Sequence, residues 1–436
     1  SLHDALPISG DAEYADYFVT IEGAPDLSQV VRPRALPLLT EFRTARGVKR
    51  VWTTFSADQV DLNLKNPEVL IRLTEVLLGY VAQGARWIRL DAIAFLWKEP
   101  GTSCIHLPQT HRIIQFWRAI LNELAPGVRL ITETNVPHHD NLSYFGDGTN
   151  EAQLVYNFAL PPLVWHTIRT GAATALAGWA RTLRLPSDGV TFFNFLASHD
   201  GIGLNPVRGL LAPAELEALV ECAVAHGGYV SYKHNPDGTR SPYELNLNYF
   251  DALSDPAGGE PLERQVSRFL CAQSILLTLQ GVPGIYVHSL LGSRGDRAAA
   301  EASGIPRRIN RAKLGLQELE RELAQPDTLR AQVFRGFGRM LRVRRQHPEF
   351  RPASPQEVWA PQPEILVVRR GDPEREGAVW CVHNVSPKDL VFEWPGGPSA
   401  IRSAPRDLLE ETAVMEGWRI PLGPYGVRWL RQSTCR

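Results

Sequence analysis

RWIRLDAIAFL, residues 86–96, is the stretch that decides the fold class. An apolar run of this length, bounded by polar sequence, predicts a buried β-strand. The apolar run ends on an acidic residue, Asp91, and residues 70–84 before it have a helical pattern. The same order, a helical segment and then a short apolar run, recurs downstream. It predicts further strands at residues 128–136, 153–160, 190–200 and 281–289.

Strands that alternate with helices suit either a closed barrel or a doubly wound sheet. The acidic residues favour the barrel, because Asp91, Glu133 and Asp200 each stand where an apolar run ends. In a (β/α)8 barrel the carboxyl ends of all strands open on one face, where active sites are built. The sequence therefore predicts an α/β fold, a partial (β/α)8 TIM barrel of strands 4–8 with a C-terminal antiparallel β-sandwich. The chain starts too late for the first three strands, so we expect exposed sheet edges.

The composition changes along the chain predict its domains. Residues 1–10 lack the basic start and the long apolar core of a secretory signal. We expect this segment to be non-native sequence. Residues 11–63, rich in proline and polar residues, predict an irregular excursion, the remnant of a domain B. Residues 64–351 are expected to form the barrel, with a Gly/Pro-punctuated loop insertion at 201–260. Short strands spaced by turns predict a β-domain at 352–436.

Composition excludes several classes of protein. The 436-residue chain is 44% hydrophobic and has a net charge of −1, which gives no support for a nucleic-acid or membrane partner. Its five cysteines contain no C-x-x-C pair, which argues against a disulfide framework and for a reducing compartment. We therefore expect a cytoplasmic protein, with no cofactor and no metal site.

Separated strings of sequence carry the chemistry. In the same order along the chain, they resemble conserved motifs of the α-amylase clan. The separations between their acidic residues leave room for one βα step and then two, as a barrel requires. The strings are QVDLN (59–63), ARWIRLDAIAF (85–95), LITETN (130–135) and FLASHDG (195–201).

Retaining cleavage of an α-glucosidic bond uses one carboxylate to attack the anomeric carbon and another to protonate the leaving oxygen. The resemblance implies that Asp91 is the nucleophile and Glu133 the general acid/base. Arg89, two residues before Asp91 on a strand, points to the same side and favours its ionised form. Asp200 would hold the sugar hydroxyls and stabilise the transition state, with His199 bonding the same edge.

Each of these residues also has an ordinary structural interpretation. A single acid at a strand end is commonly a helix cap or a salt-bridge partner. Arg-x-Asp pairs are common in buried ion pairs, and SHDG (198–201) alone is compatible with a simple turn. The joint occurrence of the motifs in order favours the catalytic interpretation.

Further strings resemble the sucrose phosphorylase group, which splits glucosides with inorganic phosphate to give α-glucose 1-phosphate. They are RPR (32–34), VWTTFSADQVDLN (51–63), EPGTSC (99–104), SHDGIG (198–203), ELNLNYFDAL (244–253) and RRINR (307–311). The resemblance implies that Phe55 and Gln59 lie beside the substrate and that Arg307 binds the glucose. It also implies that Arg34 and Tyr243 serve phosphate and acceptor binding on mobile loops. The expected partners are a small sugar substrate and inorganic phosphate.

The chain departs from the sucrose phosphorylase pattern at Phe95, Asn135 and Glu244, on the acceptor side. The overall pattern is more similar to glucosylglycerate phosphorylases or to an unassigned sugar phosphorylase. The cationic loop residues Lys233 and Arg240 suit an anionic acceptor such as glycerate. Two alternatives stay open at this stage. One is an α-glucoside hydrolase or transglucosidase with the same acidic residues, and the other is a non-catalytic carbohydrate-binding barrel.

Overall fold

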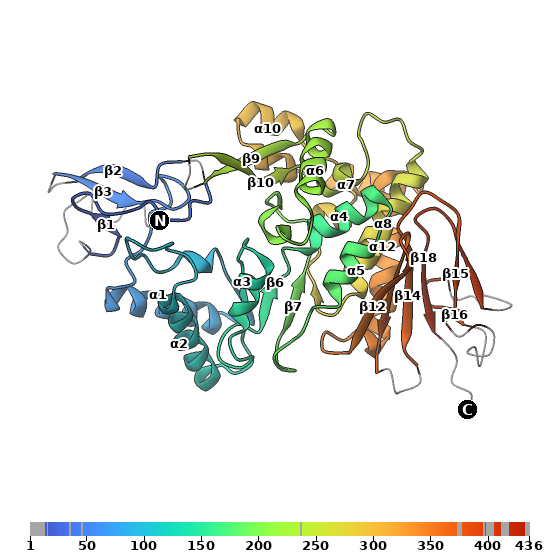
Figure 1. Ribbon diagram of the computed structural model, residues 1–436, viewed down its shortest axis with the longest axis horizontal. Coiled ribbons are helices and arrows are strands. Elements are labelled where there is room, and N and C mark those ends of the chain that lie inside the picture. The colour runs from blue at the N-terminus through green and yellow to red at the C-terminus, as the bar shows by residue number, and fades with distance from the viewer. Residues whose placement is uncertain are drawn as a thin grey trace. The chain divides into compact units, whose positions relative to one another are not determined.

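The structure, a computed structural model, describes residues 14, 16–34, 36–44, 47–235, 238–372, 377–395, 397, 405–410 and 418–431. The segment 1–10, expected to be non-native, lies outside the described residues. The chain divides into two compact units (Figure 1). The first unit comprises the residues up to 156 together with 231–243, and the second comprises 157–230 and 244–436.

The first unit begins with an antiparallel sheet in the order β1-β3-β2, where the sequence predicted an irregular excursion. The composition of this segment did not reveal its strands, because they are short, mix polar and apolar residues, and are flanked by proline-rich loops. Trp52 at the end of β3 is fully buried against Val30, Leu38 and Cys104. The strands are β1 (Thr20–Ile21), β2 (Leu39–Thr44) and β3 (Gly47–Trp52).

Parallel strands follow in the first unit, each preceded by a helix. Asn66 caps the first of these helices by accepting a hydrogen bond from the Glu68 N–H at 2.9 Å, and Pro67 occupies its first turn. The strands pair in parallel in the order β4-β5-β6. The elements are α1 (Pro67–Ala82), β4 (Trp87–Leu90), α2 (Pro108–Leu124), β5 (Arg129–Thr132), α3 (His138–Leu142) and β6 (Leu154–Tyr156), with single turns of 3-10 helix at Ile93–Phe95 and Ser143–Phe145.

The second unit holds the other predicted barrel strands, β7 and β11, which pair in parallel. Gly281, just before β11, has a φ of +132°, and a Cβ there would lie 2.6 Å from Asn194 Nδ2. Only glycine therefore fits where β11 enters beside β7. The strands that lie wholly in the second unit before the C-terminal sheets are β7 (Thr191–Asn194), β8 (Ile202–Gly203) and β11 (Val282–Pro283). The strands β9 (Tyr229–His234) and β10 (Arg240–Asn246) are divided between the units, because residues 231–243 belong to the first.

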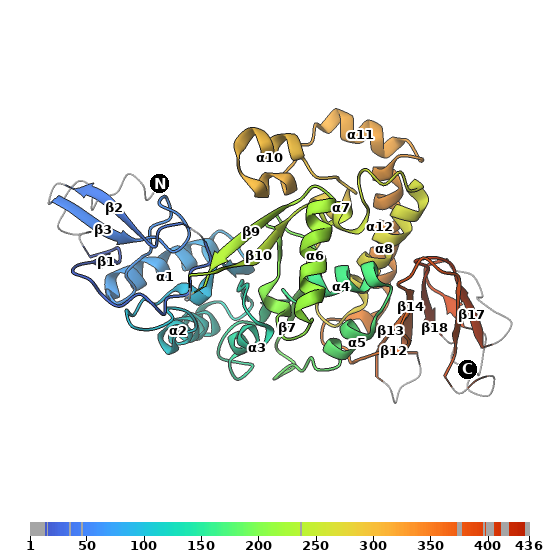
Figure 2. The same ribbon diagram turned by 45° about the horizontal axis from the view of Figure 1, so that its top comes forward.

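Helices of the second unit surround these strands (Figure 2). The longer ones are α4 (Leu160–Thr170), α6 (Pro213–Ala225), α8 (Leu262–Thr278), α11 (Leu316–Ala324) and α12 (Leu329–Gln346). The shorter ones are α5 (Thr174–Ala180), α7 (Tyr249–Leu253), α9 (Val287–Leu290) and α10 (Arg297–Ser303), with 3-10 turns at Asn205–Val207, Pro306–Asn310 and Pro348–Phe350.

The C-terminal part of the second unit is a pair of antiparallel sheets, in the orders β12-β13-β14-β18-β16 and β15-β17. Their inner faces share an apolar core that includes Val367, Phe392 and Leu430. Trp429 donates its indole N–H to Ser274 Oγ of α8 at 2.9 Å, which ties the sandwich to a barrel helix. The strands are β12 (Gln356–Gln362), β13 (Ile365–Arg370), β14 (Val379–Asn384), β15 (Leu390–Glu393), β16 (Arg406–Asp407), β17 (Arg419–Leu422) and β18 (Val427–Arg431).

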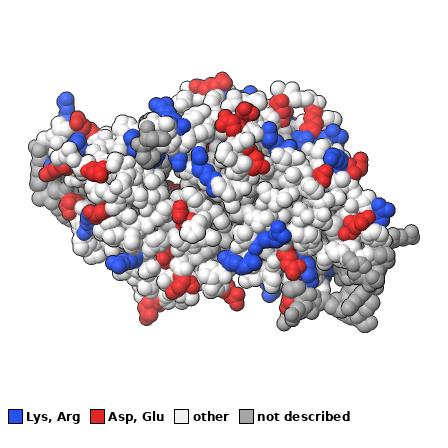
Figure 3. All heavy atoms as spheres, viewed as in Figure 1, with Lys and Arg blue, Asp and Glu red and all other residues white. Residues whose placement is uncertain are grey.

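Charged side chains of both signs are mixed on the face shown in Figure 3, in line with the net charge of −1. In the described part of the chain, a search for helices with the length and hydropathy of a membrane span returns none.

Candidate active site

The register of β4 and β5 brings two acidic residues of the first unit to one sheet edge. Leu90 pairs with Thr132, and these are the last residues of their strands. Asp91 and Glu133, which follow directly, therefore leave the sheet side by side. The structure confirms this part of the prediction from the strand ends.

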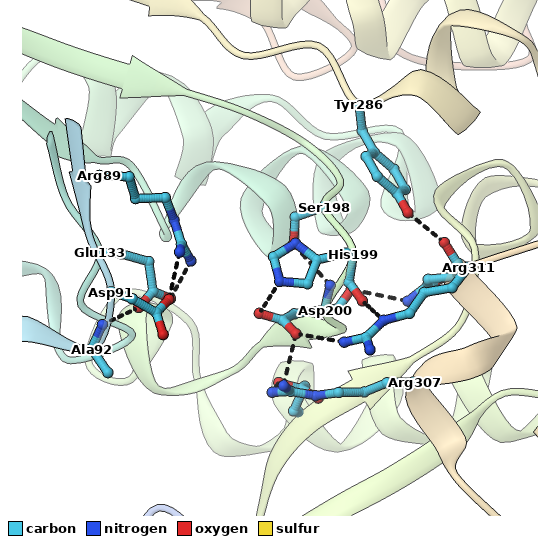
Figure 4. A network of polar contacts seen from close by, with 12 residues as sticks. Arg89, Asp91, Ala92, Glu133, Ser198, His199, Asp200, Tyr286, Arg307 and Arg311 are labelled. Carbon is cyan, nitrogen blue, oxygen red and sulfur yellow. Dashed lines mark hydrogen bonds and ion pairs between the residues drawn. The ribbon is translucent and has the colours of Figure 1, made fainter. Parts of the chain in front are cut away.

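The Arg89 guanidinium faces both carboxylates (Figure 4). Its Nη1 is 2.5 Å from Asp91 Oδ1, and its Nη2 is 3.8 Å from Glu133 Oε1. Burial opposes the charge on Arg89, but attraction to Glu133 and then to Asp91 outweighs it and raises the pKa of the guanidinium. The Arg89 guanidinium also lies 5.5 Å from the centre of the Tyr156 ring, at the end of β6. Arg89 is thus a fixed cation shared by both acids.

The two carboxylates differ in their access to solvent. The side chain of Asp91 is 70% exposed, whereas that of Glu133 is 13% exposed. Glu133 Oε2 accepts a hydrogen bond from the Ala92 backbone N–H at 2.9 Å, and Ala92 has the left-handed φ of +46°. An open carboxylate beside a shielded one is the division that a nucleophile and a proton donor require.

Asp200 of the second unit lies in a separate cluster of polar groups (Figure 4). Its Oδ1 is 2.7 Å from Arg307 Nη1 and 3.4 Å from Arg311 Nη2, and its Oδ2 is 3.6 Å from His199 Nε2. Arg311 also donates from Nε to the backbone carbonyl of His199 at 2.9 Å. The structure thus brings the predicted residues His199, Asp200 and Arg307 together.

A hydrogen-bonded chain continues from Asp200 to an aromatic side chain. Asn310 donates to the backbone carbonyl of Asp200 at 2.9 Å, and the Tyr286 hydroxyl donates to the carbonyl of Asn310 at 2.6 Å. Asp200, Asn310 and Tyr286 line a narrow pocket of about 10 Å³ together with Phe195 and Ser198. Polar groups and aromatic side chains thus converge beside Asp200.

Glu244 is a further residue of this cluster that the sequence did not identify as a site residue. Its carboxylate accepts two hydrogen bonds from Arg307, at 2.9 Å from Nε and 2.6 Å from Nη2, and the residue is 1% exposed. Pairing of β10 with β8 places Glu244 opposite Gly203. A Cβ on Gly201 would meet the Glu244 side chain at 2.6 Å, so a glycine there leaves room for it. The departure from the family pattern at position 244 was the available signal.

Other predicted residues are placed in the first unit. Phe55 packs its ring edge-on against Phe95 at 5.5 Å between centroids. Gln59 is exposed, and its Oε1 accepts from the Ser56 hydroxyl at 3.0 Å. The Arg34 guanidinium lies 6.0 Å from the centre of the Tyr243 ring, so these two predicted residues do meet.

Phe55 stands beside a buried ion pair that the sequence analysis missed. Lys98 Nζ is 2.7 Å from Asp61 Oδ1, and the Lys98 side chain is buried. The backbone N–H of Thr54 donates to Asp61 Oδ2 at 2.7 Å, which fixes the segment that carries Phe55.

Comparisons with known proteins agree with this geometry. The family profile described as Alpha amylase, catalytic domain, matches residues 7–200. A glucosylglycerate phosphorylase of Allomeiothermus silvanus is 54% identical over 88% of this chain and 68% of that protein. One from Escherichia coli is 46% identical over 96% of this chain and 73% of that protein. A sucrose phosphorylase of Agrobacterium vitis is 29% identical over 80% and 69%.

A solved structure shows the fold. The crystal structure of the sucrose 6F-phosphate phosphorylase from Thermoanaerobacter thermosaccharolyticum superimposes with a TM-score of 0.74 at 22% identity. The match covers 87% of this chain and 75% of that one. The predicted fold class, a partial (β/α)8 barrel with a C-terminal β-sandwich, is confirmed.

Proposed function

The chain belongs to the sucrose phosphorylase-like group of the α-amylase family, as a retaining α-glucoside phosphorylase, and on that premise we propose that its substrate is an α-glucoside of glycerate. Sugar and inorganic phosphate are the substrates that the group implies. The observation that carries the proposal for the site is that Arg89 pairs with both a solvent-open carboxylate and a shielded one.

In the first step, Asp91 attacks the anomeric carbon while Glu133 gives its proton to the leaving oxygen. The glucosidic bond breaks, the acceptor departs, and a glucosyl ester forms on Asp91. Phosphate then attacks the same carbon from the face opposite the ester, and Glu133 takes the proton of the attacking phosphate hydroxyl. The ester bond breaks, α-glucose 1-phosphate leaves, and the configuration is retained after two inversions.

Arg89 supports both steps by its position. Its guanidinium holds the Asp91 carboxylate in place by the ion pair at 2.5 Å. Glu133 is further from the guanidinium, at 3.8 Å, and its side chain is the more shielded from solvent of the two.

Asp200 and His199 bind the hydroxyls of the glucose and stabilise the positive charge that develops on the ring. Arg307 binds the sugar and positions the Asp200 carboxylate through an ion pair at 2.7 Å. Glu244 fixes the guanidinium from its other side by a bidentate contact.

The acceptor subsite is supported by residues of the loops. Phe55 supplies an apolar wall, Gln59 a hydrogen-bonding amide, and Arg34 with Tyr243 a cationic and aromatic pair for the phosphate or the glycerate carboxylate. Lys233, partly buried on β9, and Arg240, exposed at the start of β10, are further cations of this insertion. Glucosylglycerate phosphorylases at 46–54% identity support glycerate as the acceptor.

We extend the proposal to the domains and the location. Residues 11–63 form the excursion domain, 64–351 the barrel with its insertion 201–260, and 352–436 the β-domain. The described cysteines Cys104, Cys222, Cys271 and Cys381 are all free, which supports a reducing cytoplasmic location.

Product analysis tests this function. Glucosylglycerate, sucrose and glucosylglycerol would each be supplied with and without phosphate, and glucose and glucose 1-phosphate quantified. We expect phosphate-dependent glucose 1-phosphate with glucosylglycerate as the preferred donor. A preference for sucrose refutes glycerate as the acceptor. Release of glucose from every donor without phosphate indicates hydrolysis or transglucosylation by the same acidic residues.

A further inference from the structure

A second cavity in the second unit contains a paired thiol and imidazole that the glucoside chemistry does not use. The cavity has a volume of about 370 Å³. Cys222 lies on α6, and His226 caps the end of the same helix one turn later. Other lining residues come from α4, α8 and the segment between α7 and α8, and include Trp165, Arg169, Asp255, Glu260 and Arg268.

The hydrogen bonds of His226 define which of its nitrogens faces the thiol. Nδ1 lies 2.6 Å from the backbone carbonyl of Asp251, and a carbonyl only accepts, so Nδ1 carries the hydrogen. Nε2 is then the acceptor, 3.7 Å from Cys222 Sγ. The hydrogen bond with Cys222 raises the pKa of His226, against the opposing effect of burial. A thiol, a base and a group that orients the base are the parts of an activated nucleophile.

Unsatisfied and charged groups around the cavity point to a ligand. Trp165 is fully buried, and its indole N–H has no hydrogen-bond partner among the described residues. Arg268 is neutralised by Glu260 at 2.5 Å. Arg169 and Asp255 are exposed and have opposite charges. The cavity therefore offers exposed charges of both signs, which suit a small molecule with amino and carboxylate ends.

The other described cysteines have no such setting. Cys104, Cys271 and Cys381 are buried. Burial raises the pKa of the Cys271 thiol and of the Cys381 thiol, so their thiolate forms are disfavoured. Cys222 is partly accessible, so the three buried cysteines serve as internal controls for its reactivity.

We propose that Cys222 and His226 form a site of reversible thiol modification, which takes a low-molecular-weight disulfide of a zwitterionic amino-acid or peptide thiol. His226 Nε2 takes the proton of Cys222, and the thiolate attacks one sulfur of the disulfide. The disulfide bond of the reagent breaks, a mixed disulfide forms on Cys222, and the released thiolate takes the proton from His226. Cys222 is oxidised and half of the reagent is reduced.

Disulfide exchange on the purified full chain tests the proposal, with oxidised glutathione as the probe and peptide mass spectrometry as the readout. We expect Cys222 to gain one glutathione, and to do so about tenfold faster than free cysteine under the same conditions, as a thiol activated by a base does. The proposal is overturned if Cys222 of the unaltered chain gains no glutathione, or if it exchanges no faster than free cysteine.

Two variants sharpen the test. His226→Gln, which cannot take the proton, is expected to slow exchange about tenfold, and His347→Gln, outside the cavity, to leave it unchanged. Arg169→Gln should slow exchange with oxidised glutathione but not with uncharged hydroxyethyl disulfide. An unchanged rate in His226→Gln shows a merely accessible thiol, and equal effects of Arg169→Gln on both reagents contradict the zwitterionic ligand.

Discussion

The acidic residues of the two units sit in opposite electrostatic settings. In the first unit Arg89 is shared between Asp91 and Glu133, and Asp91 stays open to solvent. In the second unit Asp200 is held by both Arg307 and Arg311, and its side chain is 23% exposed. The first setting leaves negative charge in excess and suits groups that react or exchange a proton. The second neutralises its carboxylate and suits a group whose charge and position stay fixed.

Removal of the nucleophile in the first unit should cause the largest loss of activity. Asp91→Asn should lower glucose 1-phosphate formation at least ~10⁴-fold, because no glucosyl ester can form. Asp188→Asn, at an exposed carboxylate outside both clusters, is the matched control. Phosphorolysis rates of the purified variants provide the measurement. Activity of Asp91→Asn within tenfold of the unaltered chain would place the nucleophile elsewhere.

Removal of the proton donor should have a smaller effect that depends on the leaving group. Glu133→Gln is expected to slow cleavage of glucosides about 10²–10⁴-fold, and far less with α-glucosyl fluoride, whose fluoride leaves without a proton. Asp200→Asn should slow both donors to a similar extent, since Asp200 does not transfer a proton. Steady-state rates on the two donors distinguish the roles, and an equal loss on both in Glu133→Gln speaks against the acid.

The arginines around Asp200 should differ from each other. Arg307→Lys loses the bidentate contact with Glu244 and should reduce kcat/KM about 10–100-fold, because a lysine cannot replace a planar fork. Arg311 lies at 3.4 Å and is more exposed, so Arg311→Lys is expected to cost about threefold or less. Equal losses of kcat/KM in the two variants would show that the bidentate contact between Arg307 and Glu244 makes no particular contribution to activity.

The smallest expected effect concerns the ring beside Arg89. Tyr156→Leu removes the aromatic face 5.5 Å from the guanidinium and should lower kcat/KM about two- to five-fold, as a cation–π contact of about 0.5–1 kcal/mol implies. Tyr156→Phe keeps the face and should match the unaltered chain. A large loss in Tyr156→Phe would instead assign a function to the hydroxyl.

The first unit's carboxylates were predictable from the sequence, and so were His199, Asp200 and Arg307 of the second cluster, but the contact of Arg307 with Glu244 was not. Asp91 and Glu133 follow apolar runs directly, so local pattern and the geometry of parallel strands bring them to one edge. The contact of Glu244 with Arg307 depends instead on the pairing of β8 and β10 across a Gly/Pro-rich insertion. β8 is two residues long, and so short a strand has no periodicity to detect.

The N-terminal sheet was missed for a related reason. Residues 39–44 and 47–52 mix charged and apolar residues, and flanking prolines made the whole segment resemble irregular chain. Their pairing becomes evident only once Trp52 is seen in the core. Composition therefore separated this segment from the barrel but did not describe its structure.

Direct trapping of the glucosyl-enzyme addresses the central assignment. The chain would be incubated without phosphate with a fluorinated α-glucosyl fluoride that forms the ester faster than it breaks it, then digested and sequenced by mass spectrometry. We predict a single fluoroglucosyl group on Asp91, released when phosphate is added. A fluoroglucosyl group on Asp200 or Glu133 would contradict this assignment. So would the absence of any labelled peptide while the donor is consumed.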